Sequence, residues 1–175
     1  MKTSTFLILI GVISLLLPFN LFTSQALAQQ NTCASPKAQI PTELAYQGCL
    51  ALDDFMATFN SRDALAWAKT LNYPHIRIAG GETKIWQTPE DYARDNDLRK
   101  LAEKSGWGYS RWDWRNMVQQ SPDKLHFTVQ FTRYAPDGKK IASYESFYLL
   151  TKVNGRWGTQ FRSSFAGVAV PGAAY

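Results

Sequence analysis

Histidine is the side chain best suited to proton transfer near neutral pH, and His75 is one of only two histidines in the sequence. It lies in the alternating segment 73–78, which predicts a β-strand beside the apolar interior. His75 is therefore the candidate general base. Arg77 lies on the same side of this strand, so the pair would receive an anionic ligand if that side faces a cavity. The alternative is a surface histidine, with Ile76 and Ile78 on the core side, which hydrophobicity favours.

Other kinds of catalytic site lack a signature in the sequence. It contains no nucleophile elbow, no phosphate-binding glycine loop and no cluster of metal ligands, so neither a metal nor another cofactor is expected. Asp53 and Asp54 lie beside the apolar stripe of a helix that is predicted to begin at Glu43. At most one of these carboxylates would reach the interior, and a solvated helix edge is the alternative.

The composition is that of one globular domain. The chain has 175 residues, of which 45% are hydrophobic and 14% aromatic, enough for a sizeable core. The formal net charge is +5, but the lysines and arginines are scattered along the chain. Scattered cations do not predict the basic patch of a nucleic-acid-binding protein, so no nucleic-acid partner is expected.

Residues 1–28 are predicted to be a secretory signal rather than part of the domain. Lys2 precedes an apolar run over residues 6–22, and a small-x-small cleavage site ends at Ala28. An uncleaved membrane anchor is the alternative, although a proline and an asparagine interrupt the apolar run. Cleavage would leave an exported protein, periplasmic or extracellular, with no stable membrane anchor.

The two cysteines, Cys33 and Cys49, are predicted to form a disulfide, because an exported protein meets an oxidising compartment. The bond would tie the irregular segment 29–42 to the first helix. Two unrelated thiols are the alternative.

The β-patterned runs on either side of Asn154-Gly155 predict a hairpin, because this dipeptide suits a type I′ turn. A two-residue turn also determines which residues pair. Counting back from the turn places Tyr148 opposite Phe161 and Ser146 opposite Ser163. Since side chains alternate along a strand, these pairs share one largely aromatic face.

The opposite face of the hairpin carries Glu145 and Arg162, with Arg115 two strands away in the same row. An ion-pair network on a convex surface is favoured over an acid activated by neighbouring arginines. Because Phe147 and Leu149 lie nearby, this convex face is also the candidate interface of a homodimer.

Turns at Pro122-Asp123 and Asp137-Gly138 extend the same register over a four-stranded meander from residue 107 onward. Its concave face is then aromatic, has a few hydroxyl and amide groups and carries no Asp or Glu, which is typical of a small-molecule pocket. A filled core, in which Ser146 and Ser163 bond each other, is the alternative. The residues expected to bind a ligand are Tyr73, Trp112, Trp114, Asn116, Phe131, Tyr144, Ser146, Tyr148, Phe161 and Ser163.

The predicted order of elements is two helices between residues 43 and 71, a short hairpin over 73–87, one helix over 88–104, and the meander. Helices in the first half of the chain and strands in the second predict an α+β fold, in which the helices cover one face of a curved sheet.

This order, with the strings LNYPHIRIA at 71–79 and GRWGTQFRSSF at 155–165, resembles the NTF2-like superfamily, and specifically its bacterial SnoaL-like and DUF4440-like members. The resemblance covers residues 43–166 and leaves 167–175 as a C-terminal tail. It implies a cone, with three helices from the N-terminal half packed on a curved antiparallel sheet around a cavity. Members of the superfamily include isomerases, dehydratases and epoxide hydrolases, as well as binding or assembly domains without catalysis.

These observations predict an exported single-domain protein that binds a small, largely apolar molecule in its cone. One alternative is a lyase, isomerase or hydrolase with His75 as its general base. The other is a non-catalytic dimerisation or assembly module. Fold alone does not choose among them, and the direction of the His75 side chain is the observation that discriminates best.

Overall fold

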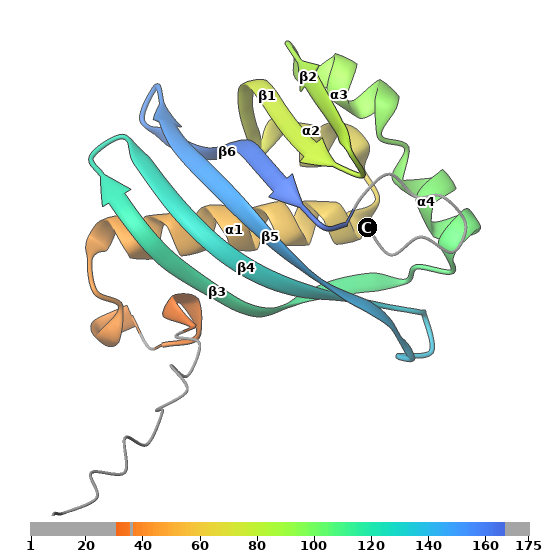
Figure 1. Cartoon of the computed structure of the whole chain (residues 1–175), viewed down its shortest axis with the longest axis horizontal. Helices are drawn as coiled ribbons and strands as arrows, with labels where there is room; N and C mark the ends of the chain where they lie inside the picture. Colours follow the sequence, from red (N-terminus) through yellow and green to blue (C-terminus); the bar gives the residue numbers. More distant parts are fainter. Residues whose placement is uncertain (1–30, 36, 167–175) are drawn as a thin grey trace, which may run out of the picture.

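The computed structural model of the chain describes residues 31–35 and 37–166 (Figure 1). The predicted signal segment 1–28 and the predicted tail 167–175 lie outside the described residues. Within the described ranges, no helix combines the length and the hydropathy that crossing a membrane requires.

The elements follow the predicted α+β order. The helical elements are the 3₁₀ turns η1 (Thr32–Ala34) and η2 (Lys37–Gln39) and the α-helices α1 (Glu43–Ser61), α2 (Ala64–Lys69), α3 (Pro89–Asp95) and α4 (Leu98–Ser105). The strands are β1 (Leu71–Ala79), β2 (Glu82–Trp86), β3 (Tyr109–Ser121), β4 (Lys124–Tyr134), β5 (Lys140–Val153) and β6 (Arg156–Ser164).

Helix α1 is the long helix that covers the sheet, and its sequence explains both its start and its orientation. The Thr42 hydroxyl accepts a hydrogen bond from the Ala45 amide (3.0 Å), so it caps the N-terminus as predicted. Leu52, Phe55 and Phe59 recur at helical spacing and are buried. The apolar stripe of α1 therefore packs into the core on the concave side of the sheet.

The single helix predicted over residues 88–104 is wrong, because the chain breaks it into α3 and α4. Asn96 leaves the helical conformation, and the Asp97 carboxylate accepts hydrogen bonds from the amides of Arg99 and Lys100. Aspartate is a strong N-cap residue, so Asp97 starts a new helix. The break lets α4 turn away from α3, and α4 lies at the end of the molecule opposite the N-terminal turns η1 and η2 (Figure 1).

The sheet has six strands in the order β2-β1-β6-β5-β4-β3. The predicted hairpin and meander are both present, but β1 runs parallel to β6, so the sheet is mixed rather than wholly antiparallel as predicted. This pairing joins the short hairpin to the meander. As a result, side chains of β1 and β6 lie next to each other on the concave face.

A β-bulge in β6 overturns part of the predicted hairpin register. Leu150 pairs with Thr159 as predicted, but Leu149 then pairs with Phe161, so Gln160 is an extra residue. A shift of one residue moves every following side chain to the other face. Tyr148 consequently lies opposite Arg162, which is buried on the concave side.

Ser146 lies opposite Ser164 rather than Ser163 for the same reason. The prediction that Phe161 and Ser163 face the concave side is therefore wrong, and so is the prediction that Arg162 lies on the convex face with Glu145.

Two irregularities in β3 have a similar effect. The register next to the turn is the predicted one, but it shifts between Met117 and Gln119 and again between Trp112 and Trp114. Asn116 pairs with Thr128 and Trp114 with Gln130, so both lie on the convex face, which contradicts their predicted orientation. The second shift returns Trp112 to the concave side, where it contacts Phe55, Phe131 and Tyr148.

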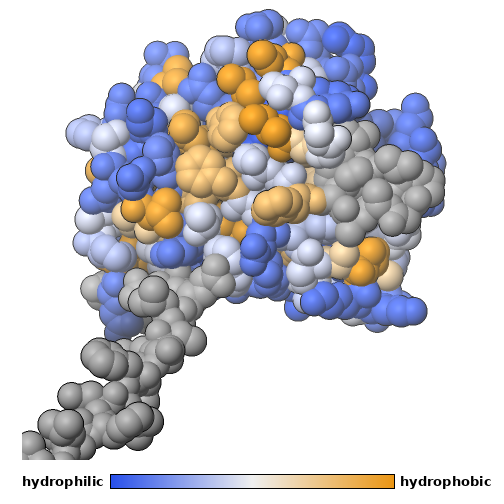
Figure 2. Space-filling model, in the orientation of Figure 1, coloured by the Kyte–Doolittle hydropathy of each residue, from blue (hydrophilic) through white to orange (hydrophobic). Residues whose placement is uncertain are grey.

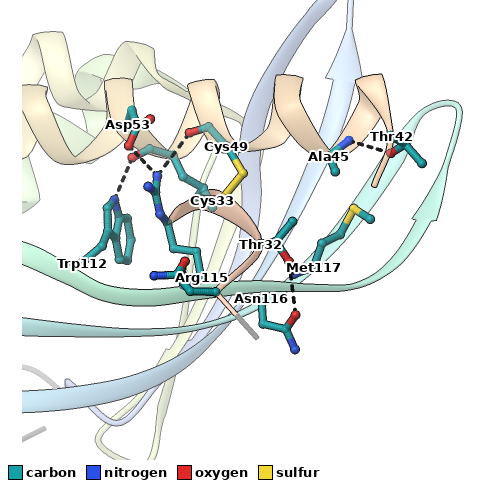
Figure 3. Close-up of a disulfide and its surroundings, with 12 residues drawn as sticks. Thr32, Cys33, Thr42, Ala45, Cys49, Asp53, Trp112, Arg115, Asn116 and Met117 are labelled. Carbon is teal, nitrogen blue, oxygen red and sulfur yellow. Dashed lines mark hydrogen bonds and ion pairs between the residues drawn. A yellow bond between two sulfur atoms is a disulfide. The ribbon is translucent and has the colours of Figure 1, made fainter. Parts of the chain in front are cut away.

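Arg115 lies between the two shifts and faces the concave side, so the prediction that it lies on the convex face is also wrong. It is buried, and its guanidinium donates to the Asp53 carboxylate and to the Cys49 carbonyl (Figure 3). Asp53 is thus engaged in an ion pair beside the N-terminal segment, while Asp54 is exposed.

The Cys33–Cys49 disulfide predicted from the sequence is present and ties η1 to α1 (Figure 3). The Thr32 hydroxyl donates to the Asn116 side chain and accepts from the Met117 amide, so this segment is also fastened to β3. This segment is thereby held against α1 and the edge strand β3, away from α4 (Figure 1).

Candidate functional site

A cavity of about 240 Å³ lies between the helices and the concave face of the sheet. Its wall is mainly apolar and aromatic, and exposed charged side chains surround its mouth. The wall includes Phe55, Met56 and Phe59 of α1, Trp67 of α2, Trp86 of β2, Leu98 and Leu101 of α4, Phe131 of β4 and Tyr148 of β5. The charged side chains at the mouth are Lys84, Asp95, Asp97, Lys100 and Lys104.

Arg162 is the most deeply buried cation in the wall of this cavity, with 6% of its surface exposed. Its Nη2 donates to the Tyr92 hydroxyl (2.5 Å) and its Nε donates to His75 Nε2 (3.3 Å). The guanidinium also lies 5.2 Å from the Phe55 ring centroid and 5.3 Å from that of Trp67. Hydrogen bonds and cation–π contacts offset part of the desolvation cost of this charge.

His75 is fully buried behind Arg162 and does not line the cavity. Because the Thr159 carbonyl can only accept, Nδ1 carries the proton and donates to it (3.1 Å). Nε2 then accepts from Arg162, so both ring nitrogens are engaged. Burial, and then the charge of Arg162, lowers the pKa of His75 well below its usual value, which keeps the ring neutral at pH 7.

His75 and Arg77 lie on the side of β1 that faces inward, although hydrophobicity favours the isoleucines there. Ile76 pairs with Phe161 on the convex face, and Ile78 is 41% exposed, so the surface position considered for His75 is wrong. The physical reason is that the buried Arg162 needs hydrogen-bond acceptors, and His75 supplies one.

Arg77 and Arg133 are two further cations in the wall of the cavity. The Arg77 guanidinium donates to the Ala166 carbonyl, and that of Arg133 lies 5.2 Å from the Tyr144 ring centroid. The Nε atoms of both arginines are buried, with no hydrogen-bond partner among the described residues. Burial and the neighbouring Arg162 lower the pKa of Arg77 to about 10, and burial lowers that of Arg133. Arg77 therefore remains charged at neutral pH.

Two of the ten residues predicted to bind a ligand, Phe131 and Tyr148, line the cavity. The row expected from Asn116, Ser146 and Ser163 does not form, because the bulges place only Ser146 on the concave side. The remaining concave residues have structural contacts: Ser146 bonds Ser164, Tyr73 donates to the Ala68 carbonyl, Trp112 donates to the Leu52 carbonyl, and Tyr144 is buried beside Arg133. Trp114, Asn116, Phe161 and Ser163 lie on the convex side.

The sequence did not indicate that three arginines belong to one site, namely Arg77, Arg133 and Arg162. One sequence signal pointed to a bulge near Arg162, namely a glycine inside a predicted strand. Gly158 packs so closely that a Cβ atom there would lie 2.9 Å from the Thr70 carbonyl oxygen. This signal indicates an irregular strand, but it does not say which residue is the extra one.

The described part of the chain contains no group of three or more side chains placed to hold a metal ion. Chemically, the site combines an apolar chamber, a hydroxyl from Ser164 and three cations, and its carboxylates lie at the mouth. Such a site is suited to holding a molecule by shape and charge.

The sequence matches no protein-family model and no curated protein. Solved structures do match. An NTF-2-like protein of unknown function from Shewanella oneidensis superposes with a TM-score of 0.58 at 11% identity, over 70% of this chain and 98% of that chain. A ketosteroid isomerase-like protein from Erwinia carotovora atroseptica gives a TM-score of 0.54 at 21% identity, over 71% and 96% of the two chains.

A third match is a protein from Catenulispora acidiphila that was solved in complex with S-DNPA. It has a TM-score of 0.57 at 13% identity, over 70% of this chain and 92% of that chain. Likeness at these identities establishes the fold, and the narrower SnoaL-like and DUF4440-like assignment stays a prediction. The chain has the NTF2-like fold.

Proposed function

We propose that this protein binds a small, largely apolar molecule in the cavity beneath α4. The observation that carries the proposal is a chamber of about 240 Å³ with an aromatic wall and a charged mouth. Ligand pockets are typically concave and mostly apolar with a few placed polar groups, and those for drug-sized ligands measure roughly 300–1,000 Å³. A ligand for this chamber is therefore smaller than a typical drug. The S-DNPA complex of the Catenulispora protein supports a ligand-binding role for the fold.

Binding is favoured over general-base catalysis by His75. That role needs a ring nitrogen that can reach a ligand, whereas both nitrogens of His75 are engaged with Thr159 and Arg162. The proposal therefore assigns His75 a positioning role, in which its ring orients the Arg162 guanidinium.

We propose in addition that the protein is exported. The disulfide between Cys33 and Cys49 is compatible with an oxidising compartment, as is the lack of a membrane-crossing helix among the described residues.

Filling the cavity tests the binding proposal. Leu101 is half-buried in α4 and lines the chamber, so Leu101→Trp would place an indole in the space of the ligand. Small apolar compounds that raise the melting temperature of the wild type should no longer raise that of the variant, because a ligand stabilises only the state that it binds. Leu65→Trp is the matched control, since Leu65 is exposed on α2 and does not line the cavity. Equal stabilisation of wild type and Leu101→Trp would contradict the proposal.

A second candidate role is assembly through the convex face of the sheet. Ile78 and Ile85 are 41% and 56% exposed, and Phe161 and Phe147 lie on the same face on the neighbouring strands β6 and β5. Figure 2 shows apolar side chains gathered in the middle of the face that it presents, with polar side chains around them. An exposed apolar patch with a polar rim is typical of a protein interface.

Sedimentation velocity tests this second role. A homodimer should dissociate in the variant Ile85→Glu, because the new carboxylate would be desolvated in the interface. Leu50→Glu is the control, since Leu50 is an equally apolar and 45% exposed side chain on α1. A wild-type protein that remains monomeric at high concentration excludes the role.

A further inference from the structure

We infer that the ligand of this cavity carries a carboxylate, which Arg162, Arg77 and Arg133 hold while its apolar body lies against the aromatic wall. The inference rests on the proposed binding function and adds the chemical class of the ligand, a small amphiphilic organic anion.

Three arginines share the wall of one cavity. No ion pair joins Arg77, Arg133 or Arg162 to a carboxylate in the described part of the chain. Arg162 is 94% buried, since 6% of its surface is exposed, and the two side chains to which it donates, Tyr92 and His75, are neutral. A buried charge without an opposite charge is costly, so an anion in this cavity gains the attraction that the protein itself does not supply.

The register of the sheet places two of these cations side by side. Arg77 of β1 and Arg162 of β6 are direct neighbours in the parallel pairing and both face the concave side. Like charges in directly opposed positions destabilise a sheet. A carboxylate between the two guanidinium groups would turn this repulsion into two favourable contacts, and Arg is the residue best shaped for such pairing.

The carboxylates at the mouth do not neutralise the arginines, because each has another partner. Asp95 accepts from the Trp86 indole (3.0 Å) and lies 3.7 Å from Arg94. Asp97 caps α4 and lies 3.8 Å from Lys100. The exposed lysines at the mouth add positive potential along the entry path, which favours the arrival of anions.

The chamber also combines charged and apolar side chains. Arg77 and Arg162 lie on the strands β1 and β6, while Met56, Phe59 and Leu98 belong to the helices α1 and α4. A molecule with a carboxylate and an apolar body satisfies both kinds of side chain at once. A neutral apolar molecule would leave the cations unpaired.

Isothermal titration calorimetry of the full chain with matched probes tests the inference. The probes are phenylalkanoates of increasing chain length, such as 4-phenylbutyrate, and the alcohols of the same length, such as 4-phenylbutan-1-ol. We expect the carboxylate to bind about tenfold to a hundredfold more tightly than its alcohol, the value of one or two hydrogen bonds to a charged group. The preference for the carboxylate should persist in about 1 M salt, because salt screens the charges of exposed lysines but screens a buried site much less.

Variants identify which cations are responsible. Arg133→Met and Arg162→Met should each reduce the preference for the carboxylate about tenfold, without weakening the binding of the alcohol. Arg133 has fewer hydrogen bonds in the fold than Arg162, so its variant keeps the test decisive if Arg162→Met does not fold. Arg99→Met is the control, because it removes an exposed positive charge from α4 outside the cavity.

The outcomes separate the two proposals. Equal affinity for acid and alcohol, with no effect of Arg133→Met, overturns the carboxylate inference and leaves the binding function in place. Loss of the preference in Arg99→Met as well would assign it to general surface charge and also overturn the inference. If no acid or alcohol in the series binds, both the inference and the proposed function are wrong.

Discussion

The buried neutral state of His75 predicts a specific dependence of stability on pH. The unfolded chain has the ordinary histidine pKa of 6.5, whereas burial and then Arg162 lower the pKa of His75 in the folded protein well below it. Below pH 6.5 the unfolded state therefore takes up a proton that the folded state does not. The contribution of His75 to stability is fully present above pH 6.5 and is lost as the pH falls.

The magnitude follows from the unfolded pKa alone, as long as the folded ring stays neutral. Lowering the pH from 7.5 to 5.5 should reduce the free energy of unfolding by about 1.4 kcal/mol through this one residue. The substitution His75→Gln removes the titration, while its amide can still donate to the Thr159 carbonyl and accept from Arg162. The variant should lack this part of the pH dependence, whatever its stability at neutral pH.

Urea unfolding of both proteins at the two pH values, followed by tryptophan fluorescence, measures the difference. Other groups with shifted pKa values, such as Asp91 and Asp97, titrate in both proteins, so their contributions cancel in the comparison. If the wild type and His75→Gln lose the same free energy between pH 7.5 and 5.5, then His75 is not held neutral in the core and its assigned role beside Arg162 is wrong.

Two further predictions concern the supports of the site. Tyr92→Phe removes the hydroxyl that accepts from Arg162 and should lower the free energy of unfolding by about 1.5–3 kcal/mol in urea, as expected for a hydrogen bond to a charged group. The control Tyr109→Phe should change it by less than about 0.5 kcal/mol, since Tyr109 is only half-buried, and a comparable loss in both variants would contradict the assignment. Cys33→Ser with Cys49→Ser should cost roughly 2–4 kcal/mol in the same assay, and an unchanged unfolding midpoint would show that the disulfide does not stabilise the fold.

Much of the architecture follows from local signals that the structure confirms. The apolar stripe and Thr42 cap predicted α1, and the Asn154-Gly155 turn predicted the hairpin between β5 and β6. The register between β4 and β5 was also correct, because Leu125 pairs with Leu150 as the alternation of side chains requires. These features depend on a few neighbouring residues, so they can be recognised in a single sequence.

The composition of the site could not be predicted in the same way. The extra residue at Gln160 exchanges Phe161 for Arg162 on the concave face, which is the opposite of what the hydrophobic pattern of the strand predicts. Each strand was expected to bury its apolar side chains, and the shift instead buries a cation and leaves an aromatic ring on the outer face. The buried cation is stabilised by the rings of Phe55 and Trp67 and by hydrogen bonds to Tyr92 and His75. These residues come from distant parts of the chain.

The sequence by itself determined α1, α2, the turns, the disulfide partners and the α+β order of the elements, because each depends on local conformational preference or on a single pair of residues. Only the tertiary structure decided which side chains face the cavity. Side chains alternate with a period of two, so one bulge moves every side chain that follows it in the strand to the other face. The contacts that favour this bulge join β6 to β1 and α3. The bulge in β6 brings Arg162 into the pocket and the inward-facing side of β1 brings in Arg77, whereas Arg133 lies on β4, whose register is the predicted one.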